Sequence, residues 1–237
     1  MSGINRQMPT VASVSGVLGY GRAKTATGPP ANTLRIAMIG DSNRDTLITN
    51  LNTAKTALGY TTTLTYTSIS ATNYNGSGLS TANYDVVVIY TNGGASPLAA
   101  GGTALNNYIA AGGKVVFLVF CWGNVAAIAN FTYTNSPYAF LGSSASGFAP
   151  TMTKIGTHPI TDGLGTSMGT SVFRSSNIVL QSDATNLGWY PDGTTSMIAV
   201  QSAPRRVGIN IFPGAGVTSN GYQLIVKSIM WAGGLLN

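Results

Sequence analysis

The sequence predicts an α/β domain over residues 34–237: a three-layer flavodoxin-like fold with a mostly parallel sheet, preceded by an extended N-terminal arm. Two segments, Tyr84–Tyr90 and Lys114–Phe120, are almost continuously apolar, which is typical of strands buried on both faces. Segments with apolar residues at helical spacing lie before and between them. This strand–helix–strand–helix–strand order implies right-handed crossovers and therefore parallel strands.

The remaining elements are assigned from the same patterns. We expect further strands at Leu34–Ile39, Thr61–Thr67, Ser171–Leu180, Met197–Gln201 and Arg206–Phe212. We expect helices at Arg44–Leu58, Ala99–Ala111 and Tyr222–Trp231, where apolar residues recur at helical spacing. Gly59 and the Gly112-Gly113 pair follow the first two helices and are suited to end them.

Residues 1–33 have a different composition from the domain and form a segment of their own. The stretch from Thr10 to Pro30 is rich in Gly, Ser, Thr and Ala and shows no sustained period. Such a stretch either remains disordered or becomes ordered on another surface. Its modest apolar content, including Val14 and Leu18, favours the second alternative, an arm that reaches a neighbouring subunit.

Composition favours a surface that is buried in an assembly. Charged residues make up only 8% of the chain, the six acidic residues are all aspartates, and there is no glutamate. The surface of a freely diffusing protein is usually hydrated by many Lys and Glu side chains. In this chain, Thr, Ser, Asn and Gly must cover most of the surface instead. The net charge of +6 reflects scarce acids, and Arg205-Arg206 is the only adjacent basic pair. We therefore do not expect nucleic acid as a partner.

Cysteine content and hydropathy argue against a disulfide-rich, a secreted or a membrane-spanning protein. Cys121 is the single cysteine, which excludes an intramolecular disulfide framework. The first ten residues lack the apolar core of a signal peptide. No apolar run approaches 18 residues, because Lys114 interrupts the longest candidate, so we expect no membrane span. Localisation is otherwise open.

The tetrapeptide Gly40-Asp41-Ser42-Asn43 follows the first expected strand, where open α/β sheets place their sites. It is similar to the nucleophile block of GDSL/SGNH esterases, which implies Ser42 as the attacking hydroxyl. That family carries its base late in the chain as Asp-x-x-His, but the only histidine here is His158, and Ile155 stands where the aspartate belongs. The alternative is that Asp41 or Ser42 caps the following helix.

Cys121 follows the Lys114–Phe120 strand and is the second candidate nucleophile. Its position resembles the nucleophile elbow of class I glutamine amidotransferases, which use a Cys-His-Glu triad. When the prolines of Arg206–Gly214 and of that family's final motif are matched, Phe212 takes the histidine position and Gly214 the glutamate position. The alternative is a small, buried, apolar cysteine.

The segment His158-Pro159-Ile160-Thr161-Asp162-Gly163 offers one histidine and one aspartate. These are too few ligands for a closed zinc site, and Asp162-Gly163 is an ordinary turn dipeptide. We therefore expect a structural turn, no metal and no cofactor.

In combination, these segments resemble one family. The order YDVVVIYTNGG, AAGGKVVFLVF, HPITDGLG, RRVGINIFPGA and GYQLIVKSIMWAGG is similar to class I glutamine amidotransferase-like domains of the trehalose-utilisation-like (ThuA-like) group. The resemblance spans about Leu34 to Gly234 and implies the flavodoxin-like fold. The chain departs from the catalytic pattern at both triad partners, so the resemblance implies a degenerate site and transfers no catalytic residue.

The leading functional hypothesis is a non-catalytic structural or assembly protein, joined to copies of itself or to other subunits through residues 1–33. Its low charge and abundant Thr, Ser, Gly and Asn resemble the composition of bacteriophage virion proteins. One alternative is a degenerate hydrolase or amidotransferase-like enzyme that uses Cys121 or Ser42. Another is a carbohydrate-binding module, in which exposed rings stack on sugars; the candidate rings are Trp122, Trp189, Tyr190 and Tyr138.

Overall fold

The computed structural model describes residues 32–41, 43–92, 97–122, 128–139, 145–148, 150–176 and 178–237. The first 31 residues, and with them almost all of the expected arm, lie outside the described residues, as does Ser42. In the described part, the order from Thr33 to Leu118 is strand, helix, two strands, helix and strand, and the second half is richer in strands. None of the described helices has the length and hydropathy needed to cross a membrane.

The elements of the first half match the predicted order. They are β1 (Thr33–Gly40), α1 (Arg44–Ala57), β2 (Thr63–Ser70), β3 (Val86–Ile89), α2 (Ala99–Ala110) and β4 (Lys114–Leu118). The elements of the second half are a 3-10 turn (Tyr133–Asn135), β5 (Ala145–Phe148), β6 (Thr153–Lys154), β7 (Val172–Arg174), β8 (Thr185–Trp189), β9 (Ser196–Ser202), β10 (Arg205–Ile209) and α3 (Ser219–Ala232).

One eight-stranded sheet organises the domain, in the order β2-β1-β3-β4-β10-β9-β8-β6. The first five strands in this order are parallel to one another, and the last three continue the sheet antiparallel. Strands β5 and β7 form a separate antiparallel pair. Four of the seven strand pairs in the large sheet are therefore parallel, and the prediction of a mostly parallel α/β sheet is confirmed.

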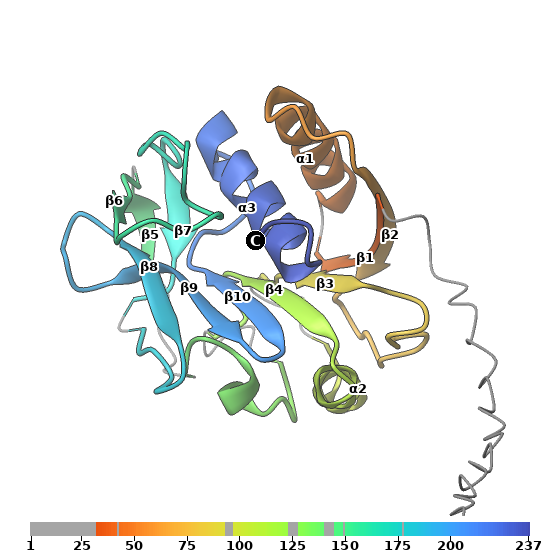
Figure 1. Ribbon diagram of the computed structural model, residues 1–237. Coiled ribbons are helices and arrows are strands. Elements are labelled where there is room, and N and C mark those ends of the chain that lie inside the picture. Colours follow the sequence, from red (N-terminus) through yellow and green to blue (C-terminus); the bar gives the residue numbers. More distant parts are fainter. Residues whose placement is uncertain are drawn as a thin grey trace, which may run out of the picture.

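The helices cover both faces of the parallel strands, giving three layers. Helices α1 and α3 lie on one face and α2 on the other (Figure 1). The strands between them alternate their side chains between the two faces: in β3, Val86 and Val88 pack towards α1 and α3, while Val87 and Ile89 pack towards α2. This burial on both faces explains the continuous apolar runs.

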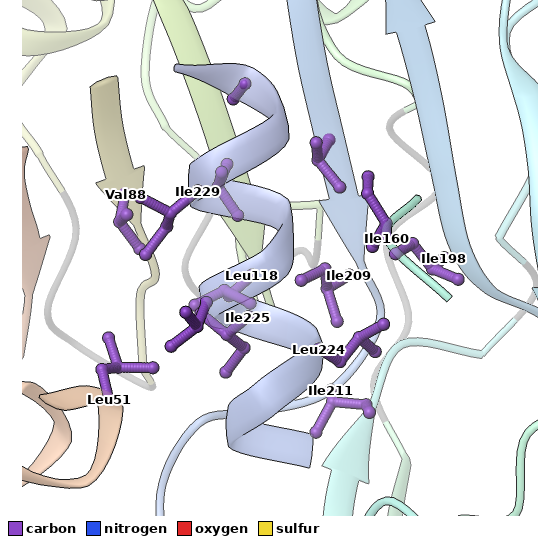
Figure 2. Close-up of a cluster of buried hydrophobic side chains, with 14 of the residues drawn as sticks. Leu51, Val88, Leu118, Ile160, Ile198, Ile209, Ile211, Leu224, Ile225 and Ile229 are labelled. Atoms are coloured by element: carbon purple, nitrogen blue, oxygen red, sulfur yellow. The ribbon is translucent and has the colours of Figure 1, made fainter. Parts of the chain in front are cut away.

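Helix α3 is covered on almost every side. Each of the nine consecutive residues from Leu224 to Ala232 is buried, which is the behaviour of a core helix. Figure 2 shows Ile225 and Ile229 beside Val88 of β3 and Leu118 of β4. Burial of each such aliphatic side chain contributes about 1.5–3 kcal/mol to the stability of the folded domain. The packing of α3 therefore stabilises the parallel part of the sheet.

Several boundaries in the second half differ from the predictions. The strand expected at Ser171–Leu180 is only Val172–Arg174, and the strand expected to reach Phe212 ends at Ile209. Strand β8 was not predicted, because Thr185–Trp189 lacks both a clear alternation and an apolar run. The prediction was most accurate where strands are buried on both faces.

Candidate functional site

The carboxyl ends of the parallel strands form the edge where this type of sheet places its sites. Asp41 follows β1, Thr91 and Asn92 follow β3 at a short distance, and Cys121 and Asn210 follow β4 and β10. We call this the carboxyl edge. The opposite end of the same strands, where β4 and β10 begin, is called the amino edge.

Asp41 is the acidic residue of this edge. Its side chain is 8% exposed, and its Oδ1 atom has no hydrogen-bond partner. Burial raises the pKa of Asp41 above its ordinary value, and the side chain of Asn92 and the nearby Arg44 partly offset the shift. Arg44 also donates to the carbonyl oxygens of Gly40, at 2.8 Å, and Asp41, which fastens the turn between β1 and α1.

The N-cap residue of helix α1 does not cap it through its side chain. Its N-cap residue is Asn43, which adopts the left-handed conformation with φ of 76° and makes no capping hydrogen bond through its side chain. Asp41 therefore lies too early to serve as the N-cap, and the expectation that it does so is wrong. Ser42 cannot be placed, because it lies outside the described residues.

Cys121 is enclosed in the core beneath the carboxyl edge. Its thiol is fully buried and donates to the Ile89 carbonyl oxygen at 3.4 Å. Its own carbonyl oxygen accepts a hydrogen bond of 2.8 Å from the Tyr133 hydroxyl. Burial raises the pKa of Cys121 to about 12, so the thiol stays protonated at neutral pH. Such a cysteine behaves as a small apolar core residue.

Aromatic rings from the ends of β3, β4 and β10 and from β7 pack together at the carboxyl edge. Phe120 and Phe212 stack with their centroids 5.6 Å apart, and the edge of Tyr90 meets Phe212 at 6.1 Å. Phe173 contacts Phe120 at 5.8 Å and Phe212 at 6.2 Å. These four rings are called the aromatic group. Phe212, the residue matched to a catalytic histidine, is thus a packing residue that offers no proton acceptor.

The single histidine lies at the amino edge. The His158 ring is 5.4 Å from the ring of Trp231, and the guanidinium of Arg205, the first residue of β10, lies 4.9 Å from the same indole. Strand β10 runs parallel to β4, so His158 and Cys121 lie at opposite ends of the strands. Five residues of β4 separate these ends by roughly 16 Å. The structure therefore does not bring the histidine and the thiol together.

His158 has a structural role in its turn. Its Nδ1 atom accepts a hydrogen bond of 3.2 Å from the backbone N–H of Ile160, and its own N–H donates to Asp162 Oδ1 at 3.2 Å. Partial burial lowers the pKa of His158, against the opposing effect of Asp162. Within the described ranges, His, Cys and Asp residues form no group of three that could bind a metal ion.

Two lysines that the sequence analysis did not select hold this turn in place. Lys227 of α3 donates to the Asp162 carbonyl oxygen, and Lys154 of β6 donates to the Leu164 carbonyl oxygen. Lys227 is only 7% exposed, and burial lowers its pKa. The expectation of a structural turn at His158–Gly163 thus agrees with its contacts.

Asn210 is the most constrained polar side chain at the carboxyl edge. It is fully buried, accepts from the Ser175 N–H at 2.8 Å, and donates to the carbonyl oxygens of Ser175 and Ser196 at 3.0 and 3.2 Å. It therefore joins the ends of β10, β7 and β9. Sequence reasoning missed it, because its partners are 14 and 35 residues away.

Three of the four rings considered for sugar stacking are in the core. Trp122, Tyr138 and Tyr190 are each at most 1% exposed. Trp122 donates from Nε1 to Ser136 at 2.6 Å, and the Tyr138 hydroxyl is 2.9 Å from that of Ser196. The expectation that these three rings are exposed is therefore wrong. Their burial is possible because their polar atoms form hydrogen bonds inside the protein. Trp189 is half-buried.

A hollow of about 320 Å³ opens between α1 and the segment that precedes α3. Its described lining consists of Asn43, Thr46, Leu47, Asn50, Pro213, Gly214, Ala215 and Tyr222. The lining carries amide and hydroxyl groups but no charged side chain.

Comparison with known proteins agrees with this architecture. No family model and no curated protein matches the chain. Solved structures are similar, among them three that are each 12% identical in sequence. A ThuA-like protein from Parabacteroides merdae ATCC 43184 has a TM-score of 0.57, over 85% of this chain and 90% of that one. The chain has the ThuA-like fold.

Two more of the similar structures come from Salmonella typhimurium. Cytoplasmic protein STM1381 from strain LT2 has a TM-score of 0.58 and covers 85% of this chain and 98% of its own. Cytoplasmic protein STM3548 has a TM-score of 0.57, with 84% and 98% covered. At this level of identity the ThuA-like likeness extends to the fold alone.

Proposed function

We propose that this chain is a non-catalytic structural component of a larger assembly, with a virion as the favoured setting. It uses the ThuA-like domain, related in design to glutamine amidotransferases, as a scaffold whose catalytic triad is degenerate. Because one fold can serve many functions, a ThuA-like domain can have a structural role without catalysing a reaction.

One observation carries the proposal: the groups that a thiol hydrolase needs are held apart. The Cys121 thiol is buried with a raised pKa, whereas His158 lies at the other end of the strands. A nucleophile needs a base within hydrogen-bond reach. Phe212, the residue that the resemblance matches to the base, packs instead against Tyr90 and Phe120.

The assembly role is supported by composition and by the N-terminal segment. Low charge and a surface rich in Thr, Ser and Asn suit burial against neighbouring subunits better than free diffusion. Residues 1–33 are proposed to reach a neighbouring subunit. The virion setting rests on composition.

The mass of the purified full chain tests the proposal. We expect a defined multimer by sedimentation velocity, and we expect deletion of residues 1–31, which leaves all of β1, to dissolve it into small folded units. A full chain that sediments at the mass of one chain contradicts the assembly role. A truncated chain that assembles normally contradicts the role of the arm.

The second candidate is an enzyme that uses Ser42, and Asp41 is the observation that favours it. This carboxyl group is buried with one unpartnered oxygen and a raised pKa, a pattern found at functional sites. Labelling of the full chain with a fluorophosphonate tests this alternative, with Ser42→Ala as the matched control. Labelling that the variant abolishes supports an enzyme and contradicts the non-catalytic proposal.

A further inference from the structure

The two edges of the eight-stranded sheet are protected to very different degrees. Exposed sheet edges pair with other chains unless they are short, charged, bulged or interrupted by proline. At one edge, β6 has two residues, one of them Lys154. At the other edge, β2 runs for eight residues, Thr63–Ser70, with no charged residue and no proline. None of these protective devices is therefore present in β2.

Strand β2 is regular and open on its outer side. Its register with β1 continues without a shift over all eight residue pairs, and among the described residues β1 is its one strand neighbour. Five of its side chains are exposed: Thr63, Thr65, Thr67, Ser68 and Ser70. Threonine, tyrosine and isoleucine, which dominate the strand, favour extended pairing. At 3.3 Å per residue the open edge is roughly 26 Å long.

The outer face of α1 extends this surface. Helix α1 lies beside β2 at the same end of the sheet (Figure 1), and Lys55 of the helix donates to the Thr62 carbonyl oxygen at 2.9 Å. A shallow hollow of about 640 Å³ lies over its outer residues, which are Thr49, Asn52, Thr53, Thr56 and Ala57. None of these residues is charged.

The threonines of this hollow are internally satisfied. The hydroxyls of Thr49, Thr53 and Thr56 each donate to a carbonyl oxygen one turn earlier, at 2.9–3.1 Å. Their desolvation on contact with another surface therefore leaves no hydroxyl proton unpaired. A strand edge alone is small beside a stable interface of about 800 Å² per partner, and the α1 face supplies additional area.

We propose that the β2 edge, together with the outer face of α1, binds the same surface of a second copy of this chain, with the two β2 strands antiparallel about a two-fold axis. This inference rests on the proposed assembly function and names one of its interfaces. An isologous contact places each surface against itself. Strand β2 itself has no charged residue, so the paired strands place no like charges directly opposite each other. Two cations of α1 lie beside the strand and are hydrogen-bonded there: Arg44 donates to Ser68 Oγ at 3.0 Å, and Lys55 donates to the Thr62 carbonyl oxygen.

The N-terminal segment is less suited to the same edge. A paired strand needs a stretch without proline and with few glycines. The longest stretch of residues 1–31 without either residue type has six residues, as in Thr10–Ser15, whereas β2 has eight. A second β2 therefore matches the open edge in length and regularity, and the N-terminal segment remains available for a different contact.

Charge placed on the edge tests the proposal in the full chain. The variant Thr63→Lys/Thr67→Lys adds two charges to exposed positions whose β1 neighbours are Thr33 and Ala37. The matched control Thr103→Lys/Asn107→Lys adds the same charge to exposed positions of α2. The single variant Thr67→Lys is a milder backup, and circular dichroism checks that each chain is folded.

The readouts are mass by sedimentation velocity and hydrogen exchange of the β2 amides. We expect the edge variant to halve the mass and to accelerate exchange at least tenfold, with no change in the control. If the edge variant keeps the mass of a multimeric wild type, the β2 edge is not the interface, and the edge proposal fails. The proposed assembly function is not contradicted by that result, because the wild type is still a multimer. If the β2 amides exchange slowly while the protein sediments as a single chain, a second copy does not cover the β2 edge. The chain's own N-terminal segment then covers it instead. A single-chain wild type with fast β2 exchange overturns both proposals.

Discussion

The carboxyl and amino edges of the parallel strands hold different kinds of side chain. At the carboxyl edge, where related folds place their chemistry, the aromatic group and the fully bonded Asn210 fill the strand ends. At the amino edge, the histidine and Lys227 fasten a turn. The Cys121 thiol and the His158 imidazole thus lie at different ends of the parallel strands. A thiol and an imidazole can act together only if the strands place both at the same end of the sheet, and the presence of both residue types in a sequence does not establish this.

Removing the Asn210 amide is expected to give the largest effect on the carboxyl edge. Asn210→Ala removes the side-chain partner of three buried backbone groups, which are the Ser175 N–H and the carbonyl oxygens of Ser175 and Ser196. Each such group costs about 1–3 kcal/mol, so we expect a loss of about 3–4 kcal/mol in the free energy of unfolding. Urea unfolding measures it, with the exposed Asn52→Ala as a control within about 0.5 kcal/mol. A loss below about 1 kcal/mol contradicts the role of Asn210 as a clamp.

Truncating the aromatic group is expected to have an intermediate effect. Phe212→Ala removes ring contacts to Tyr90, Phe120 and Phe173. Because Phe212 is only half-buried, we expect a loss of about 2 kcal/mol, less than for a fully buried ring. The Phe212→Leu variant retains apolar volume and should lose under about 1.5 kcal/mol. If both substitutions are neutral in thermal unfolding, the aromatic group does not hold the strand ends together.

The pH response of the amino edge is the smallest expected effect. Burial lowers the folded-state pKa of His158 below its ordinary value, with Asp162 opposing and Arg205 reinforcing the shift. The unfolded chain therefore binds the proton more readily, and stability falls as the pH drops through about 6.5. His158→Asn keeps an acceptor for the Ile160 N–H and removes the titration. Urea unfolding at pH 7.5 and 5.0 should show a larger loss in the wild type; an equal loss contradicts this account.

How much of this could be predicted depends on where each structure-determining contact lies in the sequence. Strands β3 and β4 and helices α1 and α2 were predicted because burial on both faces leaves continuous apolar runs and packed helices leave periodic ones. The structural turn at His158 was predicted from local turn residues. Burial of Cys121 was one of two alternatives, since free cysteines are often buried.

The rest depends on contacts between distant segments. Strand β8 is half-buried and contains Asn186 and Gly188, so it leaves no readable pattern. The early end of β10 reflects the bonds that Asn210 makes to β7 and β9, which no local pattern encodes. The enclosure of Trp122 depends on Ser136 and Tyr138, which lie on another segment. Sequence reasoning therefore located the carboxyl edge correctly but not the packing of its aromatic residues.

The reactivity of the Cys121 thiol tests the central claim most directly. The native full chain is treated with iodoacetamide at pH 7.5, and the labelled fraction is followed by mass spectrometry, with the urea-unfolded chain as the reference. A fully buried thiol with a pKa of about 12 should label at least a thousandfold more slowly in the native chain than in the unfolded one. Native labelling as fast as that of the unfolded chain, or faster, contradicts the non-catalytic account.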